Sequence, residues 1–332
     1  MNQDVINKLR NAGLLSEEPT DLGFVSTGSY ALNWVISGMA RKGGIPIGRI
    51  TQFYGEASTA KTVFATHILK DAQDKGYYAV LIDSENSYSS EFAETLGLDP
   101  EKLIYATPDT LEDCFHTIET IVDDIRKVDP DTPIVVAYDS LAVSPCKKEL
   151  EADNFDSDNM IGALRAKLTG AALRRINTQV LKKKFALVII NQIRSKVGVM
   201  YGNPETLASG GNSLEFYLGV SMKTISNKTK DIVKDDNGVA IGIQGRLANK
   251  KNKCSHPFRS CEFKLFYDKG LDPYFGIIPV LVSEGILDNS SKGWFSLMGE
   301  EKKYRASDIE TALREGTHRE ELKPVFDFFE QE

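Results

Sequence analysis

The chain has 332 residues, of which 41% are hydrophobic and 26% are charged, so it is long enough for one substantial core and a small appended domain. Its net charge of −7 excludes a nucleic-acid site spread over the whole molecule and leaves only a local basic surface. No apolar run approaches the roughly 20 residues of a membrane helix, and the four cysteines form no disulfide framework. We therefore expect a cytoplasmic protein without a membrane partner.

Residues 1–23 begin with apolar side chains at helical spacing. Val5, Ile6 and Leu9 stand among polar neighbours, a pattern that indicates an amphipathic helix. We expect this N-terminal helical segment to dock on another surface, and one candidate for that surface is a second protomer.

The core is predicted to span residues 24–269. Predicted strands alternate with predicted helices, the strands at residues 49–54, 78–83, 134–139 and 186–193, and the helices at residues 31–36, 63–72, 111–125 and 162–181. This alternation indicates parallel βαβ units, and hence an α/β fold with a mostly parallel, twisted sheet flanked by helices. Three shorter strands are predicted to extend the sheet in antiparallel fashion, at residues 220–225, 241–248 and 261–267.

The last segment, residues 270–332, is predicted to form a small C-terminal α+β domain. Helical patterns at residues 276–287 and 309–313 surround an apolar segment that contains Trp294 and Phe295.

A phosphate-binding loop is predicted between the first long strand and the helix after it. The segment has the P-loop spacing and consists of Gly55, Glu56, Ala57, Ser58, Thr59, Ala60, Lys61 and Thr62, followed by Val63. In such a loop, backbone N–H groups surround the phosphates, the lysine reaches the β- and γ-phosphates, and the threonine hydroxyl binds Mg²⁺. Ala60 departs from the pattern, since glycine is usual there. An ordinary strand-to-helix turn remains the alternative.

Polar side chains stand at the ends of three further strands. Asp139 ends one strand, Glu85 follows another, and Gln192 lies near the end of a third. An enzyme that uses a P-loop needs an acid near the metal and a group that positions the attacking water, both at carboxyl ends of neighbouring strands. We assign Asp139 to the metal with Thr62, and Glu85 to the water. A helix cap for Asp139, a strand-end cap for Gln192 and a solvated loop for Glu85 remain open.

The chain resembles the RecA family of DNA strand-exchange recombinases over roughly residues 24–270. The resemblance rests on segments that occur in the family's order, at residues 26–29, 44–50, 191–194, 198–206 and 210–212. The run at residues 198–206, which reads GVMYGNPET, is the most specific. The C-terminal segment is more similar to recombinases of large bacteriophages, so we expect a phage-encoded member that acts in its bacterial host's cytoplasm.

This resemblance implies roles for individual residues. Glu85 matches the glutamate that activates water, and Phe92 falls where an aromatic ring stacks on adenine. Gln192 falls where a glutamine links the γ-phosphate of ATP to a DNA-binding loop. Lys251 and Lys253 match lysines that reach across a protomer interface to the neighbour's ATP. A solvated basic strand remains the alternative for the two lysines.

The resemblance also implies two DNA-binding loops, at residues 193–211 and 154–161. The expected contacts with DNA come from cations, apolar wedges and flexible glycines, namely Arg194, Lys196, Val197, Gly198, Met200, Gly210 and Gly211. Arg165, Lys167 and Arg174 follow on the predicted helix, together with Arg175. A solvated helix face remains the alternative for these last four.

Three functions remain possible at this level. The first is an ATP- and Mg²⁺-dependent recombinase that forms helical filaments on single-stranded DNA, pairs it with homologous double-stranded DNA, and works with a single-strand-binding protein or a loader. The second is a hexameric motor or regulatory ATPase of the same fold. The third is a DNA-binding filament in which Ala60 has weakened ATP hydrolysis. Two departures from bacterial RecA, the short segment before the core and Glu215 at an interface lysine position, put the usual filament contacts in doubt.

Overall fold

A computed structural model gives the fold of the chain and describes residues 3–12, 22–151, 159–195, 205–207, 211–227, 230–291 and 293–331. Within these residues, every helix is too short or too polar to cross a membrane. The chain begins with helix α1 (Gln3–Asn11), whose Val5 and Leu9 side chains are exposed. The predicted N-terminal helix is therefore confirmed.

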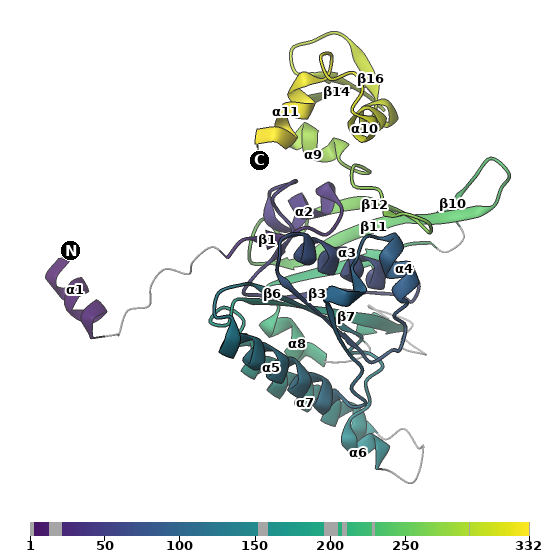
Figure 1. Cartoon of the computed structure of the whole chain (residues 1–332). Helices are drawn as coiled ribbons and strands as arrows, with labels where there is room; N and C mark the ends of the chain where they lie inside the picture. The colour runs from purple at the N-terminus through teal and green to yellow at the C-terminus, as the bar shows by residue number, and fades with distance from the viewer. Residues whose placement is uncertain are drawn as a thin grey trace.

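Parallel strands form the centre of the molecule (Figure 1). They are β3 (Ile50–Gly55), β4 (Tyr78–Asp83), β5 (Leu103–Ala106), β6 (Ile134–Asp139), β7 (Phe185–Ser195) and β9 (Val220–Ile225). Every residue of β6 is buried, because helices cover both faces of the sheet. The prediction of a mostly parallel α/β sheet is confirmed.

Antiparallel strands extend this sheet beyond β9. They are β10 (Ile232–Lys234), β11 (Ala240–Asn252), β12 (Ser260–Phe266) and β13 (Gly270–Leu271), while β8 (Glu205–Leu207) pairs with the end of β7. The order across the sheet is β13-β12-β11-β9-β3-β7-β6-β4-β5, with β10 on β11. The predicted antiparallel extension is confirmed for β11 and β12, and β11 continues four residues beyond the expected residue 248. The prediction was wrong for residues 220–225, because β9 pairs in parallel with β3 and is antiparallel only to β11 on its other side.

Helices cover the two faces of the sheet (Figure 1). One face carries α2 (Tyr30–Ser37), α3 (Lys61–Asp74) and α4 (Ser90–Thr95), and the other carries α5 (Leu111–Val128), α7 (Asn159–Asn177) and α8 (Gly211–Tyr217). The short helices η1 (Pro100–Lys102) and α6 (Lys147–Leu150) lie in connections, and β1 (Phe24–Val25) pairs with β2 (Ile45–Pro46). Helix α3 buries Phe64, Ile68 and Ala72, which recur every four residues along it.

The C-terminal elements form a small antiparallel sheet with helices beside it. They are α9 (Ile278–Ser283), β14 (Leu287–Ser291), β15 (Trp294–Leu297), β16 (Lys303–Arg305), α10 (Ala306–Glu315) and α11 (Lys323–Gln331). The helix expected over residues 276–287 is shorter, since Gly285 takes a positive φ of 71° and Leu287 enters a strand. The structure thus has the small C-terminal α+β unit, while the exact domain boundaries stay a prediction.

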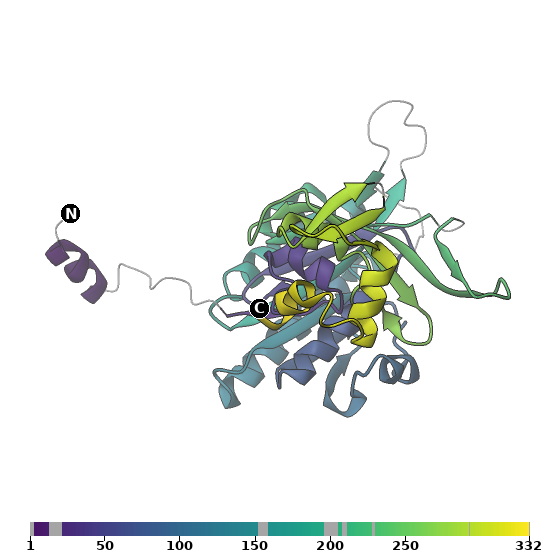
Figure 2. The ribbon, with the colours of Figure 1, turned by 90° about the horizontal axis from the view of Figure 1, so that it is seen from above.

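Aromatic contacts join the C-terminal elements to α2. The ring of Tyr30 lies 5.0 Å from that of Tyr274 and 5.2 Å from that of Phe329, and Trp34 Nε1 donates to Glu284 at 2.7 Å. Figure 2 shows the C-terminal helices over the middle of the core. Their apolar side chains belong to the same buried cluster as those of α2 and α3.

Candidate active site

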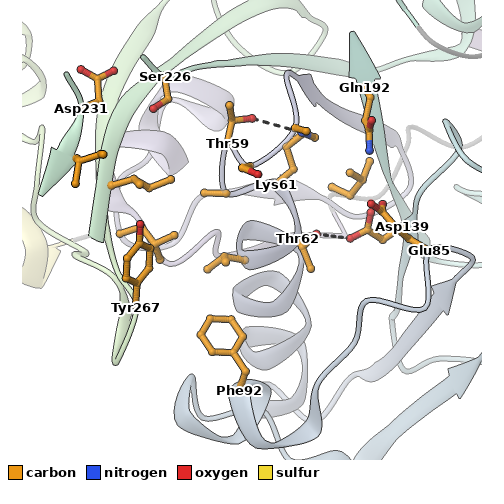
Figure 3. A pocket seen from close by; sticks show the side chains of 18 of the residues that line it. Thr59, Lys61, Thr62, Glu85, Phe92, Asp139, Gln192, Ser226, Asp231 and Tyr267 are labelled. Carbon is orange, nitrogen blue, oxygen red and sulfur yellow. Dashed lines mark hydrogen bonds between the residues drawn. The ribbon is translucent and has the colours of Figure 1, made fainter. Parts of the chain in front are cut away.

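The register of the parallel strands brings the predicted polar residues to one edge of the sheet. Gly55 pairs with Gln192 of β7, and Asp83 of β4 pairs with Asp139 of β6. A cavity of about 550 Å³ opens beside this edge (Figure 3). Its walls include Lys61, Thr62, Glu85, Phe92, Asp139 and Gln192. Residues from distant parts of the sequence therefore meet where α/β proteins commonly bind ligands.

The hydroxyl group of Thr59 stabilises the loop between β3 and α3 through two contacts. Thr59 Oγ1 donates to the carbonyl of Glu56 at 2.8 Å and lies 2.7 Å from Thr224 Oγ1. A Cβ atom on Gly55 would collide with Thr224, so glycine is required at this close approach. The loop then leads into α3, and the N-terminus of an α-helix generally suits an anion.

Ala60 is the residue immediately before α3 and has a φ of 66°. This left-handed conformation costs a residue with a Cβ about 1–2 kcal/mol, whereas glycine adopts it readily. Ala60 therefore adopts, at a cost in backbone strain, the conformation that glycine would adopt readily. The loop still makes the turn that a P-loop needs.

Reverting Ala60 to glycine should leave nucleotide binding intact and stabilise the fold by up to about 1 kcal/mol, because relief of strain outweighs the added freedom of the unfolded chain. Thermal unfolding and nucleotide titration would measure both effects. Ala57→Gly is the matched control, since Ala57 lies in the same loop without a positive φ and should show no gain. A severe loss of nucleotide binding in Ala60→Gly would contradict the P-loop geometry.

Lys61 is only 6% exposed. Its Nζ donates to the carbonyl of Glu56 at 2.5 Å and approaches Thr59 Oγ1 at 3.4 Å. The ammonium group is thus held inside the curve of the loop, where it can exchange a carbonyl partner for phosphate oxygens.

Thr62 and Asp139 form a pair of oxygen donors beside Lys61. Thr62 Oγ1 donates to Asp139 Oδ2 at 2.6 Å, and Asp139 is 2% exposed. Burial raises the pKa of Asp139 to about 6, although the Thr62 hydrogen bond opposes the shift. Asp139 Oδ1 is buried with no hydrogen-bond partner in the described part of the chain. Hydroxyl and carboxylate oxygens suit Mg²⁺, and a cation here would stabilise the charged carboxylate.

Glu85 lies on the exposed loop after β4, facing the same cavity (Figure 3). Its Oε2 atom accepts a hydrogen bond from Ser140 Oγ at 3.2 Å, and its backbone N–H donates to Asp83 Oδ1 at 3.1 Å. The carboxylate is therefore held in place while one side remains open to solvent.

Aromatic rings line the far end of the cavity. Phe92, on α4, faces it from one wall, and Tyr267, directly after β12, lines another (Figure 3). Sequence reasoning found Phe92 but missed Tyr267, together with Ser226 and Asp231 on the segment between β9 and β10. An aromatic residue at the end of a predicted strand was the available signal for Tyr267, and Ser226 and Asp231 gave none.

Comparison with known proteins identifies the family. The RecA N-terminal domain family matches residues 8–272. Protein RecA of Clostridium acetobutylicum is 37% identical over 272 residues, covering 82% of this chain and 72% of that protein. Protein RecA of Thioalkalivibrio sulfidiphilus is 34% identical over 295 residues, covering 89% and 80%, and that of Thermus aquaticus is 35% identical over 272 residues, covering 82% and 75%.

This chain belongs to the RecA family. It is a RecA-type recombinase and a DNA-dependent ATPase. The family binds nucleotides, usually with Mg²⁺, and binds DNA in filaments. The comparisons leave the expected phage origin a hypothesis.

The DNA-binding loop predicted for this RecA-family chain is described only at its ends. Strand β7 continues through Arg194 to Ser195, and these residues pair with β8, so the two ends of the loop lie side by side. Gly211 begins α8. Five of the expected DNA contacts fall outside the described residues, namely Lys196, Val197, Gly198, Met200 and Gly210. Residues 154–158 of the first predicted loop, which spans residues 154–161, also lie outside them.

The basic residues of α7 make contacts within the chain. Arg165 Nη2 donates to the carbonyl of Ala142 at 3.0 Å, Arg174 Nε to the hydroxyl of Tyr217 at 3.1 Å, and Arg175 Nη2 to Glu119 at 2.7 Å. Lys167 is exposed. Their contacts with DNA stay a prediction, and the half-buried Arg165 also has a structural role in holding the turn after β6.

Lys251 and Lys253 lie near the end of β11 and do not line the cavity of their own chain. Lys251 Nζ donates to the carbonyl of Glu215, and partial burial and the charge of Lys253 lower the pKa of Lys251. Two cations therefore lie close together, away from the cavity of their own chain, and their contact with a neighbouring protomer stays a prediction.

Proposed function

We propose that this RecA-family protein binds and hydrolyses ATP with Mg²⁺ in the cavity at the ends of β3, β4, β6 and β7. In this proposal it does so as a filament on single-stranded DNA, which it pairs and exchanges with homologous double-stranded DNA. The observation that carries the proposal is the convergence of Lys61, the Thr62–Asp139 pair, Glu85 and Gln192 on one cavity.

Binding begins with the phosphates at the N-terminus of α3. Residues 57–63 line the cavity, where their backbone N–H groups would bind phosphate oxygens, and Lys61 would shift from the carbonyl of Glu56 to the β- and γ-phosphates. The adenine ring lies toward Phe92 and Tyr267, whose faces suit stacking. Thr62 and Asp139 would hold the Mg²⁺ ion, which would neutralise phosphate charge.

Hydrolysis requires a water molecule in line with the γ-phosphate. Glu85 faces the cavity and orients this water, accepting its proton as the new oxygen–phosphorus bond forms. The bond from the γ-phosphorus to the oxygen that bridges the β- and γ-phosphates breaks in the same step, and ADP leaves with that oxygen. Gln192, on the neighbouring strand, contacts the γ-phosphate and senses its loss. The charge that develops on the phosphate is stabilised by Lys61 and by cations from a second protomer.

Lys251 and Lys253 supply those cations to the neighbour's ATP. Replacing either with alanine should lower DNA-stimulated ATP hydrolysis at least about tenfold while changing ATP affinity little, because the charge acts mainly in the transition state. Steady-state hydrolysis and nucleotide titration measure the two quantities. Lys127→Ala, which removes an exposed lysine whose ion pair is with Asp124, is the matched control.

Mixing two inactive variants tests action across the interface. In a random filament of Glu85→Gln and Lys251→Ala protomers, about a quarter of the interfaces combine an intact glutamate with an intact lysine from the neighbour, since head-to-tail contacts join different surfaces. We expect partial recovery of hydrolysis in the mixture. If no ratio restores activity, the lysines do not act on a neighbour's ATP.

Filament formation separates this function from the hexameric motor, and hydrolysis stimulated by DNA separates it from the filament with weakened ATP hydrolysis. Electron micrographs with ATP and single-stranded DNA should show open filaments, and single-stranded DNA should stimulate hydrolysis. Closed rings would favour the motor, and filaments without hydrolysis would favour the weakened ATPase. We further propose action in the cytoplasm of a bacterial cell, with a single-strand-binding protein or a loader as partner.

A further inference from the structure

A group of hydroxyl side chains lies behind Glu85 and links the ends of β4 and β6. It consists of Ser84, the residue before Glu85, and of Tyr138, Ser140 and Ser144 at the end of β6 and in the loop after it. Tyr138, Ser140 and Ser144 are fully buried. Buried hydroxyl groups are costly unless they are hydrogen-bonded, so their arrangement is expected to be well defined.

The hydrogen bonds of this group have a consistent direction. Tyr138 OH lies 2.6 Å from Ser144 Oγ, and burial raises the pKa of Tyr138, which keeps its proton available. Ser144 Oγ donates to Ser84 Oγ at 2.8 Å, and Ser84 Oγ donates its single proton to the carbonyl of Ser140 at 3.0 Å. Ser144 Oγ has a second acceptor for its single proton, the carbonyl of Ser140 at 3.2 Å, and Ser84 Oγ is the nearer of the two.

Ser84 holds the backbone of the opposite loop at three points. Its Oγ atom accepts from the Ser140 N–H at 3.2 Å and donates to the Ser140 carbonyl, and its own N–H donates to the carbonyl of Asp139 at 2.9 Å. One residue thus fixes both the residue proposed to hold Mg²⁺ and the residue after it.

These contacts close a ring around Glu85. Ser140 Oγ donates to Glu85 Oε2 at 3.2 Å, the backbone of Ser140 is held by Ser84 Oγ, and Ser84 is joined to Glu85 by the peptide bond. Asp83, which is 1% exposed, accepts from the N–H groups of Glu85, Ser87 and Tyr88. The exposed carboxylate of Glu85 is therefore positioned from its backbone and from its side chain.

We infer that Ser84 is a positioning residue for Glu85, acting through Ser140 to hold the carboxylate against the water that attacks ATP. This inference rests on the proposed role of Glu85. Without the Ser84 hydroxyl, the Ser140 backbone loses a donor and an acceptor, and Ser144 loses the nearer of its two acceptors. The contact between Ser140 Oγ and Glu85 then has no fixed support.

The first test compares Ser84→Ala with a matched serine. Ser84→Ala should lower kcat for DNA-stimulated hydrolysis about ten- to a hundredfold, the loss expected when a reacting group is misplaced by about 1 Å, and leave KM for ATP within about twofold. Ser84→Thr keeps a hydroxyl and should retain most of kcat. Ser87→Ala, on the same exposed loop, should behave as the unaltered protein. Thermal unfolding with bound ADP shows whether each variant is folded.

A double-mutant cycle separates positioning from a general structural effect. In the Glu85→Gln background, adding Ser84→Ala should cause no further loss of single-turnover hydrolysis, because its effect acts through the missing carboxylate. Normal kcat in Ser84→Ala, an equal loss in Ser87→Ala, or a full additional loss in the double variant would each overturn the inference. If Glu85→Gln itself keeps normal turnover, the proposed role of Glu85 fails and the inference fails with it. If Glu85→Gln loses turnover while Ser84→Ala does not, only the inference fails.

Discussion

Lys61→Ala should weaken ATP binding by at least about a hundredfold, because it removes the buried cation that we propose makes charge-assisted contacts with two phosphates. Lys61 lies inside the P-loop and is 6% exposed, so no nearby solvent ion replaces it easily. Glu85→Gln should instead keep ATP binding and lower hydrolysis by about 10²- to 10⁴-fold, since an amide cannot accept the proton of the attacking water. The two variants thus separate binding from turnover.

Nucleotide titration and single-turnover hydrolysis measure these effects. Lys70→Ala is the matched control for Lys61, because Lys70 lies on the same helix and pairs with Asp74 at the surface, where an ion pair contributes little. Normal hydrolysis in both Lys61→Ala and Glu85→Gln would remove the catalytic assignment from this cavity.

The strand-end residues of the site could be predicted from sequence because the strands are buried on both faces. The continuous apolar run of residues 134–138 marks β6, and its first polar residue is Asp139. The same reasoning places Glu85 just after β4 and Lys61 at the start of α3. Carboxyl ends of parallel strands meet at one edge, so proximity followed from the fold class.

Other parts of the site depend on pairing that the sequence pattern does not reveal. Tyr267 reaches the cavity because β12 pairs antiparallel with β11 in one particular register, and a shift of one residue would turn its side chain to the opposite face. The contact of Ser84 with Ser140 joins residues 56 positions apart. Small polar residues near strand ends have many local roles, such as caps, so this contact had no distinct sequence pattern.

The roles of the charged residues of helix α7 could not be predicted from the sequence either. Arginines and apolar residues both occur along this helix, which indicates an amphipathic helix but does not show which arginine is exposed. In the structure, Arg165 is half-buried against backbone carbonyls, whereas Arg174 is exposed. The long arginine side chain can bury its stem and still place its charge on a polar partner, so spacing alone does not separate a DNA contact from a structural contact.

The second large effect is expected at Gln192, where the proposed nucleotide cavity meets the predicted DNA-binding loop. Gln192 lines the cavity beside Gly55, and the same strand continues into the segment that pairs with β8. A strand transmits a shift of its end over short distances because its ladder of hydrogen bonds moves as a unit. Contact between Gln192 and the γ-phosphate would therefore bias the position from which the DNA-binding loop begins.

Because binding free energies are linked, a non-hydrolysable ATP analogue should tighten single-stranded DNA binding by the same factor by which DNA tightens analogue binding. We expect this factor to be about 5- to 150-fold relative to ADP, the usual range of such coupling. Gln192→Ala should remove most of it in both directions while leaving DNA affinity with ADP unchanged. Asn177→Ala, an exposed amide at the end of α7, should keep the full coupling.

The decisive measurement is DNA affinity with ADP and with the analogue, in the unaltered protein and in Gln192→Ala, at fixed salt because phosphate contacts make affinity salt-dependent. Four affinities define the coupling without any assumption about the path between the sites. If Gln192→Ala weakens DNA binding equally with both nucleotides, the side chain supports the loop but does not sense the γ-phosphate. If all four affinities are equal, nucleotide and DNA bind independently, and hydrolysis cannot control release from DNA through this strand.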